Sequence, residues 1–191
     1  MEGNDTRTQL QRTIEAHFSA VGKVAAFWSE FERQLQMTVW KLAGIDAFSG
    51  ACITSRIDSS AKLLEAIISL LQLKGVAAQD LERLTAFCEE AADLQRERDR
   101  IVNDPWSFRI VDAFPHRKEV ERYKNPGHDH VPHSTKEVDA FAERISDLLY
   151  KLQGILSTIP LLAPGSDSES KSKIGRLSPI LPINTTKTHA D

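Results

Sequence analysis

RDRIVNDPW at residues 98–106 sets an arginine on the apolar face of a predicted helix and then ends that helix. Leu94 lies four residues before Arg98, and Ile101 follows it by three, so these side chains share one helical face. Arg98 is therefore predicted to point inward. A buried guanidinium is costly without a partner and cannot lose its proton. Its partner is either a carboxylate of the fold or a phosphate from outside.

The segments before this stretch are predicted to be helical. Apolar residues recur at steps of three or four in three places: residues 14–42, 57–71 and 81–101. Gly44 and Gly75 are natural stops for the first two helices, and Pro105 ends the third because it disfavours helical geometry at the residue before it. Gly22 allows a kink or a break into two helices near it, and we expect one long helix with an irregular first third.

The connecting segments carry weaker signals. We expect a loop at residues 48–50, with either Thr54 or Asp58 as the cap of the second helix. Residues 107–114 alternate polar and apolar side chains, which predicts a short strand, and residues 120–123 are its expected partner.

The last predicted helix has the clearest start signal. Ser134 and Glu137 form a capping box, and the apolar rhythm of residues 138–155 is typical of a helix packed against antiparallel neighbours, ending at Pro160. The sequence therefore predicts an all-α fold. We expect an up-and-down bundle of four to five helices with a small β-hairpin inserted before the last helix.

Composition predicts one domain and a tail. The chain has 191 residues, of which 41% are hydrophobic, so residues 1–162 are assigned to one helical domain. Residues 163–191 are rich in Ser, Lys, Pro and Thr and are predicted to be disordered. Their apolar part, residues 177–183, could dock on a partner, although such tails more often lack a binding role. Cys52 and Cys88 are interpreted as two buried thiols in a reducing compartment.

Charge limits the classes of partner. The formal net charge is -3 and the sequence pI is about 6.1, which argues against a strongly basic nucleic-acid binder. Any RNA contact is expected to be focal, and no DNA partner is expected. No apolar run approaches the roughly 20 residues that cross a bilayer, so we expect a cytoplasmic protein with no membrane contact.

The order of these elements, together with residues 98–103, resembles the HEPN superfamily of compact helical domains, many of which are RNA-cutting toxins. The family motif is an arginine followed by a polar residue, with a histidine a few residues further on. Arg98 and Asp99 match its first part, and Asn103 stands where the histidine would be. The resemblance covers about residues 22–158 in element order and this one segment in motif.

The resemblance implies a homodimer in which arginine holds the scissile phosphate and histidine moves the proton. Because the amide of Asn103 does not titrate, a step typically worth about 10²- to 10⁴-fold in rate is lost. We therefore expect a degenerate ribonuclease motif that binds RNA or a protein partner around Arg98, Asp104 and Trp106 without efficient cleavage and without a cofactor. Toxin–antitoxin systems and phage defence are the settings that the family implies.

An active metal-independent endoribonuclease is a second hypothesis. It would need another base, from Asp99, Asp104 or a histidine of the segment 128–133. His128, His130 and His133 also suggest a metal site, but their spacing lacks a regular frame and no cysteine joins them. A solvated loop is the favoured interpretation, so no metal is expected.

A purely structural interaction module is the third hypothesis. There, Arg98 would form an ion pair with Glu30 or Glu32 of the first helix, which is the ordinary solution to a buried charge. Asn103 would be a helix C-cap. Trp106 is interpreted as core packing under the hairpin rather than as a platform for base stacking.

Overall fold

The computed structural model describes residues 2–108, 114–118 and 130–160. Within them the chain forms five helices and one three-stranded sheet. In chain order these are α1 (Glu2–Ala43), α2 (Ala47–Thr54), α3 (Ser60–Leu73), α4 (Ala78–Asn103), β1 (Trp106–Phe108), β2 (Pro115–Lys118), β3 (His130–Pro132) and α5 (Thr135–Ser157). The predicted all-α bundle with a small antiparallel β element before the last helix is confirmed.

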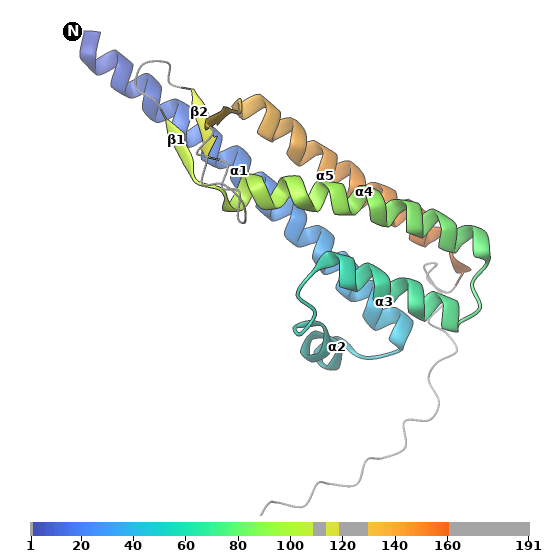
Figure 1. Cartoon of the computed structure of the whole chain (residues 1–191). Helices are drawn as coiled ribbons and strands as arrows, with labels where there is room; N and C mark the ends of the chain where they lie inside the picture. The colour runs from blue at the N-terminus through green and yellow to red at the C-terminus, as the bar shows by residue number, and fades with distance from the viewer. Residues whose placement is uncertain (1, 109–113, 119–129, 161–191) are drawn as a thin grey trace, which may run out of the picture.

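The bundle is built along α1, which contacts every other helix (Figure 1). α4 and α5 lie beside it, α3 packs against its C-terminal half, and α2 lies at that same end. The sheet sits at the opposite end, where α4 stops and α5 starts. One apolar core runs between the helices, and its largest fully buried side chains include Trp28, Phe31, Phe87, Phe141 and Ile145. The site at the end of α4 is thus held between the core and the sheet.

α1 is a single helix without a break, so the irregularity predicted at Gly22 is wrong. Gly22 is exposed, and a side chain there would meet nothing within 4 Å. The apolar face of the helix, from Ala20 to Leu42, is held continuously by the core. That burial outweighs a glycine penalty of about 1 kcal/mol. The helix ends as predicted, with Gly44 at φ 66°.

The loop expected at residues 48–50 is instead helix α2. Asp46 caps it, because its carboxylate accepts hydrogen bonds from the amides of Phe48 and Ser49. Gly50 faces the ring of Trp40, and a Cβ there would lie 2.5 Å from that ring. Only a glycine therefore allows α2 to approach α1 so closely. Most of the apolar side chains of α2, such as Phe48, remain exposed.

α3 begins with a different cap from the two predicted. Ser59 accepts from the amide of Lys62, whereas Asp58 pairs with the Lys62 ammonium and Thr54 accepts from the Trp40 indole. Gly75 follows α3 with φ 73°, as its predicted stop. The three candidate caps lie within six residues, and pattern alone did not separate them.

The ends of α4 and α5 follow the prediction. α4 stops at Asn103, and Asp104 is extended at φ −74° and ψ 144° as the following proline requires. Both hydrogen bonds of the capping box between Ser134 and Glu137 are formed. α5 ends at Ser157. The boundary at residue 162 and the tail predicted from 163 fall outside the described residues.

The sheet has the order β1-β2-β3, and both pairs are antiparallel. Trp106 pairs with Arg117, and Arg117 pairs with Val131. The strand expected at residues 107–114 is present as β1 at its start, while residues 109–113 and the proposed partner 120–123 lie outside the described part. The loop expected around the histidines is β3 over His130–Pro132, because pairing with β2 satisfies its backbone groups.

The two cysteines differ from the prediction. Cys52 is exposed on α2 and Cys88 is only partly buried on α4, and both are free thiols. The apolar neighbours of Cys52 in sequence misled the prediction, because α2 presents them to solvent. In the described part of the chain, no helix has both the length and the apolar character needed to cross a membrane.

His17 joins the sheet end to α1. Its ring is fully buried, 4.2 Å from the ring of Trp106 and 5.5 Å from that of Phe108 between centroids. Its Nδ1 lies 3.3 Å from the hydroxyl oxygen of Thr135. Burial, and then the nearby His133, lower the pKa of His17 from its ordinary value of 6.5.

This environment predicts acid-sensitive stability. Below about pH 6.5 the unfolded chain protonates His17 while the folded chain keeps it neutral, so the free energy of unfolding should fall as pH drops through this window and be regained above it. Urea unfolding at pH 7.5 and 5.5 measures the difference. His17→Gln, which cannot titrate, should be less stable but flatter with pH, and an equally steep slope in that variant would contradict this assignment.

Candidate nucleic-acid interface

Arg98 lies on the inner side of α4, as its spacing from Leu94 and Ile101 predicts. Both of those residues are buried, and the Arg98 side chain is 24% exposed. Its Cζ lies 5.9 Å from the centroid of the Trp28 ring, within the range of a cation–π contact. Its Nη1 donates to Asp99 Oδ1 at 2.8 Å, and its buried Nε has no hydrogen-bond partner among the described residues.

The carboxylates of α1 do not pair with Arg98. Glu30 accepts from Arg33, and these hydrogen bonds lower the pKa of Glu30 to about 2. Glu32 accepts from the Trp28 indole at 3.0 Å. The ion pair expected for the structural hypothesis is thus formed with Asp99 instead. Glu32 still serves Arg98 indirectly, because it holds the ring on which the guanidinium rests.

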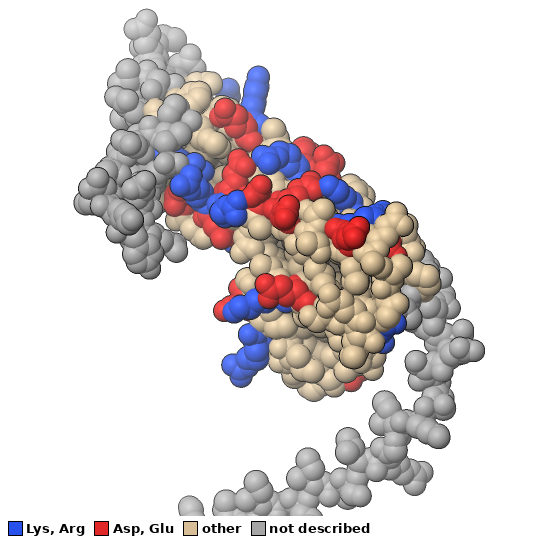
Figure 2. Space-filling model, turned by 45° about the vertical axis from the view of Figure 1, so that its right-hand side comes forward, with Lys and Arg blue, Asp and Glu red and all other residues tan. Residues whose placement is uncertain are grey.

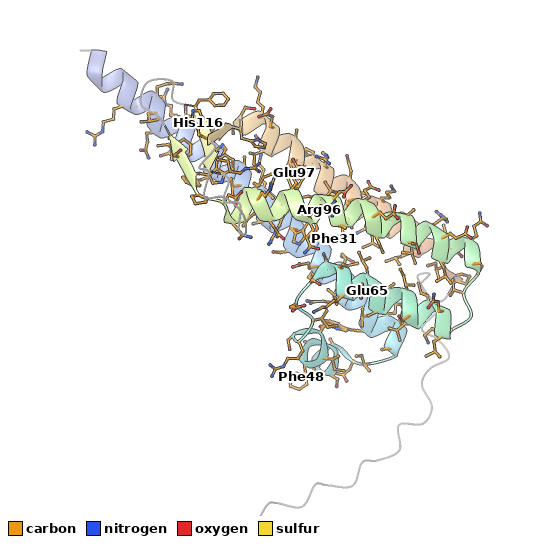
Figure 3. The ribbon with its side chains drawn as sticks, viewed as in Figure 1. Phe31, Phe48, Glu65, Arg96, Glu97 and His116 are labelled. Atoms are coloured by element: carbon orange, nitrogen blue, oxygen red, sulfur yellow. The ribbon has the colours of Figure 1, made fainter. Side chains whose placement is uncertain are left out.

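An open groove of about 680 Å³ lies beside this end of α4 and reaches strand β2. Figure 3 places Arg96 and Glu97 on α4 between the sheet, marked by His116, and α3, marked by Glu65. Asp99 lines the groove and also binds Arg98, so this carboxylate connects the partly buried guanidinium to the open surface. The described lining residues are Asp93, Arg96, Glu97, Asp99, Arg100 and Arg117.

The charges of this groove alternate in sign. Arg96 pairs with Asp93, and these side chains are 73% and 70% exposed. Arg144 of α5 donates to Glu97 at 3.1 Å. Figure 2 shows acidic and basic side chains interleaved over this half of the face, whereas the other end is mostly uncharged. Exposed ion pairs contribute little to stability, so an incoming anion can displace them at small cost.

Arg117 is the most enclosed cation of the groove. It lies on β2 and is 5% exposed, and its Nε is 3.8 Å from Asp104 Oδ2. Asp104, the residue that caps α4, is therefore drawn toward the sheet. This contact fixes the position of β2, which forms one wall of the groove, relative to the end of α4.

Asn103 is exposed at the last helical position of α4, and the C-cap is Asp104 rather than Asn103. Five residues separate it from Arg98, which corresponds to about 140° around the helix and about 7.5 Å along it. The two motif positions therefore do not share one face of α4.

Trp106 lies on β1 and packs its ring between the sheet and the core, as the core-packing interpretation predicts. Its indole donates to the carbonyl of Ile101 at 2.9 Å, and its ring lies against His17. The side chain is partly buried against the core. It thereby fixes the turn between α4 and β1.

The histidine segment is only partly described. His128 and Asp129 fall outside the described residues, and His133 lies near His17 and Trp106. In the part of the chain that the structure describes, no group of three or more histidine, cysteine or acidic side chains is close enough to hold a metal ion.

Sequence reasoning located Arg98 and Asp99 but missed three arginines of the groove. Arg96 and Arg100 belong to a polar stripe with Asp93 and Glu97 at helical spacing, and this signal could have found them. Arg117 could not have been found, because nothing local in the sequence places β2 against the end of α4.

No family model, no curated protein and no solved structure matches this chain. The structural class of the chain is therefore described from its fold and its groove alone. It is a helical bundle with a charged groove at the C-terminal end of its fourth helix, next to a small sheet.

Proposed function

We propose that this chain is a HEPN-like domain that pairs with a second copy and binds RNA phosphates through the groove at Arg98, without efficient cleavage. The observation that carries the proposal is the set of contacts that Arg98 makes at the edge of the groove. Its guanidinium is oriented by the Trp28 ring and bound by one carboxylate, Asp99, which itself lines an open groove.

The charges beside Arg98 support binding of an anion. A phosphate can take two parallel hydrogen bonds from a guanidinium, and these are stronger than neutral hydrogen bonds. Arg96 is held only by an exposed partner. Its rearrangement toward a phosphate would therefore cost little, whereas Arg117 is held rigidly by the sheet.

The acidic and amide side chains near the end of α4 are poorly suited to act as a general base, which supports the absence of efficient cleavage. Asn103 is exposed, but its amide does not titrate near neutral pH. Asp99 is bonded to Arg98, and Asp104 lies beside Arg117. These two candidate replacement bases thus already face a cation instead of a free space where a ribose hydroxyl could sit.

The directions of Arg98 and Asn103, which diverge by about 140° around α4, support pairing of two chains. In the arrangement that the resemblance implies, both motif positions of both copies face one composite cleft. The alternating charges of the groove suit such pairing, because in a twofold interface residue i of one copy contacts residue j of the other, and neighbouring residues of this groove carry opposite charges.

Two single substitutions test the proposal in opposite directions. RNA affinity is measured by fluorescence anisotropy with a short labelled single strand of mixed sequence. Arg98→Gln should weaken binding about tenfold, or about 1.4 kcal/mol. Asp99→Asn keeps the shape but removes the competing charge, so it should tighten binding several-fold. Arg83→Gln, at the far end of α4 beside Thr158, is the matched control and should change nothing.

The same titration separates the rival functions. If RNA does not bind and Arg98→Gln only lowers the melting temperature, the chain is a structural module and the proposal fails. If the unmodified chain cuts RNA and Arg98→Gln abolishes the cut, the chain is an active ribonuclease. If Arg98→Gln and Arg83→Gln weaken RNA binding equally, the binding reflects the overall charge of the chain and not a site at Arg98.

A further inference from the structure

An apolar groove of about 300 Å³ lies between α3 and α4, away from the Arg98 site. Leu64 and Ala91 form a buried floor, and small side chains such as Ala61 leave the space open. Glu65 and Glu89 stand on its walls, and Figure 3 shows Glu65 on α3 facing the neighbourhood of α4. The groove is apolar at its base and acidic at its rim.

This groove continues along α4. A second, wide-open hollow of about 490 Å³ shares Thr85 and Glu89 with the first and adds Leu81 and Glu82, and all of its described lining residues belong to α4. From Leu81 to Gln95 the combined channel follows α4 for about 21 Å at the helical rise. A peptide lying in it would pass three carboxylates.

The chain leaves the bundle close to this channel. Thr158, just after α5, accepts a hydrogen bond from Arg83 of α4 at 3.2 Å, and Ile159 is fully buried. The sequence beyond contains KSKIGR at residues 171–176 and LSPILPI at residues 177–183. Leu177 lies seventeen positions after Pro160, and this length of chain spans about 22 Å as a flexible coil and up to about 56 Å when extended. Either span is enough to pass around one helix about 10 Å thick.

We propose that residues 177–183 of the same chain dock in the channel between α3 and α4, with the basic residues before them facing its acidic rim. The dimensions agree, because seven residues in an extended, proline-bearing conformation cover about 22 Å. Pro179 and Pro182 lack amide donors, so burying this backbone on an apolar floor leaves fewer donors unpaired.

The charges of the two parts are complementary. Lys171, Lys173 and Arg176 precede the apolar stretch, and Glu65 and Glu89 stand close enough to Cys88 to help burial raise the pKa of its thiol. A basic segment would relieve this concentration of negative charge. The proposal replaces, for residues 177–183 alone, the expectation that the tail has no binding role, and it does not depend on the RNA site.

Cys88 on the groove wall provides the probe for a test in the full chain. With Cys52→Ser removing the other thiol, Ile180→Cys should form an intramolecular disulfide with Cys88 under mild oxidation, at least about tenfold faster than Ser170→Cys. Position 170 is closer to the tether point, so a freely moving tail would make the control the faster pair. Glu65→Lys with Glu89→Lys, both exposed, should slow the Ile180→Cys reaction.

Three outcomes would overturn the proposal. Equal or slower crosslinking at position 180 than at position 170 would show that the tail does not dock. A disulfide between two chains at low protein concentration would assign the groove to a second copy. If neither the two charge reversals nor salt changes the rate of the disulfide between positions 180 and 88, the tail is not attracted by the acidic rim. The disulfide would then reflect random collisions of the tail with Cys88.

Discussion

Asn103→His is expected to give this chain an RNA-cutting activity. The histidine would supply a group that titrates near neutral pH at the position where the resemblance requires one, and general acid–base catalysis is typically worth about 10²- to 10⁴-fold in rate. Because Asn103 is exposed at the end of α4, the substitution should leave the melting temperature nearly unchanged. Cleavage of a labelled RNA strand, followed at several protein concentrations, measures the gain.

The controls for this variant separate catalysis from contamination. Asn103→Gln keeps an amide and should stay inactive, and the double variant with Arg98→Gln should lose the gained activity. If two copies form the cleft, the rate per chain should rise with protein concentration. No gain in the histidine variant, with RNA still bound, would contradict the assignment of position 103 to the family motif.

Trp28→Ala should have the largest effect on stability. The ring is buried, lies 5.1 Å from that of Phe31 between centroids, supports Arg98, and donates to Glu32. Its removal leaves a cavity in the core and an unsupported cation, so the free energy of unfolding should fall by about 3–5 kcal/mol. Thermal unfolding should show a melting temperature lower by about 10 °C.

Trp28→Phe is the matched control. It keeps most of the buried area but loses the hydrogen bond to Glu32 and part of the attraction for Arg98, so its loss should be near 1 kcal/mol. A loss in Trp28→Ala no larger than in Trp28→Phe would show that the ring does not organise the core or the arginine.

The parts of the fold that local chemistry specifies were predictable. Gly44 and Gly75 have the left-handed backbone that ends a helix, and the capping box at Ser134 starts one. α2 was missed because its stability comes from long-range packing. Its two buried residues, Gly50 and Thr54, both contact Trp40 of α1, and its exposed apolar side chains give no periodic pattern.

The sequence was enough to predict the position of the site, but not the residues that contact Arg98 there. Helical spacing predicted that Arg98 faces inward, but the partner carboxylate was sought on α1. Because adjacent residues on a helix do not face each other, helical spacing does not predict Asp99 as the partner. The long arginine side chain folds back over Trp28 and reaches it nevertheless. Arg117 enters the groove through sheet pairing, which local sequence does not encode.

The most direct measurement is a map of RNA binding on the isotope-labelled chain by nuclear magnetic resonance. The backbone amides of residues 93–100, and the arginine Nε–H signals of Arg98 and Arg117, should shift on addition of single-stranded RNA. The amides of α2 and of the groove between α3 and α4 should not. Shifts confined to those other surfaces, or none at a saturating RNA concentration, would contradict an RNA site at Arg98.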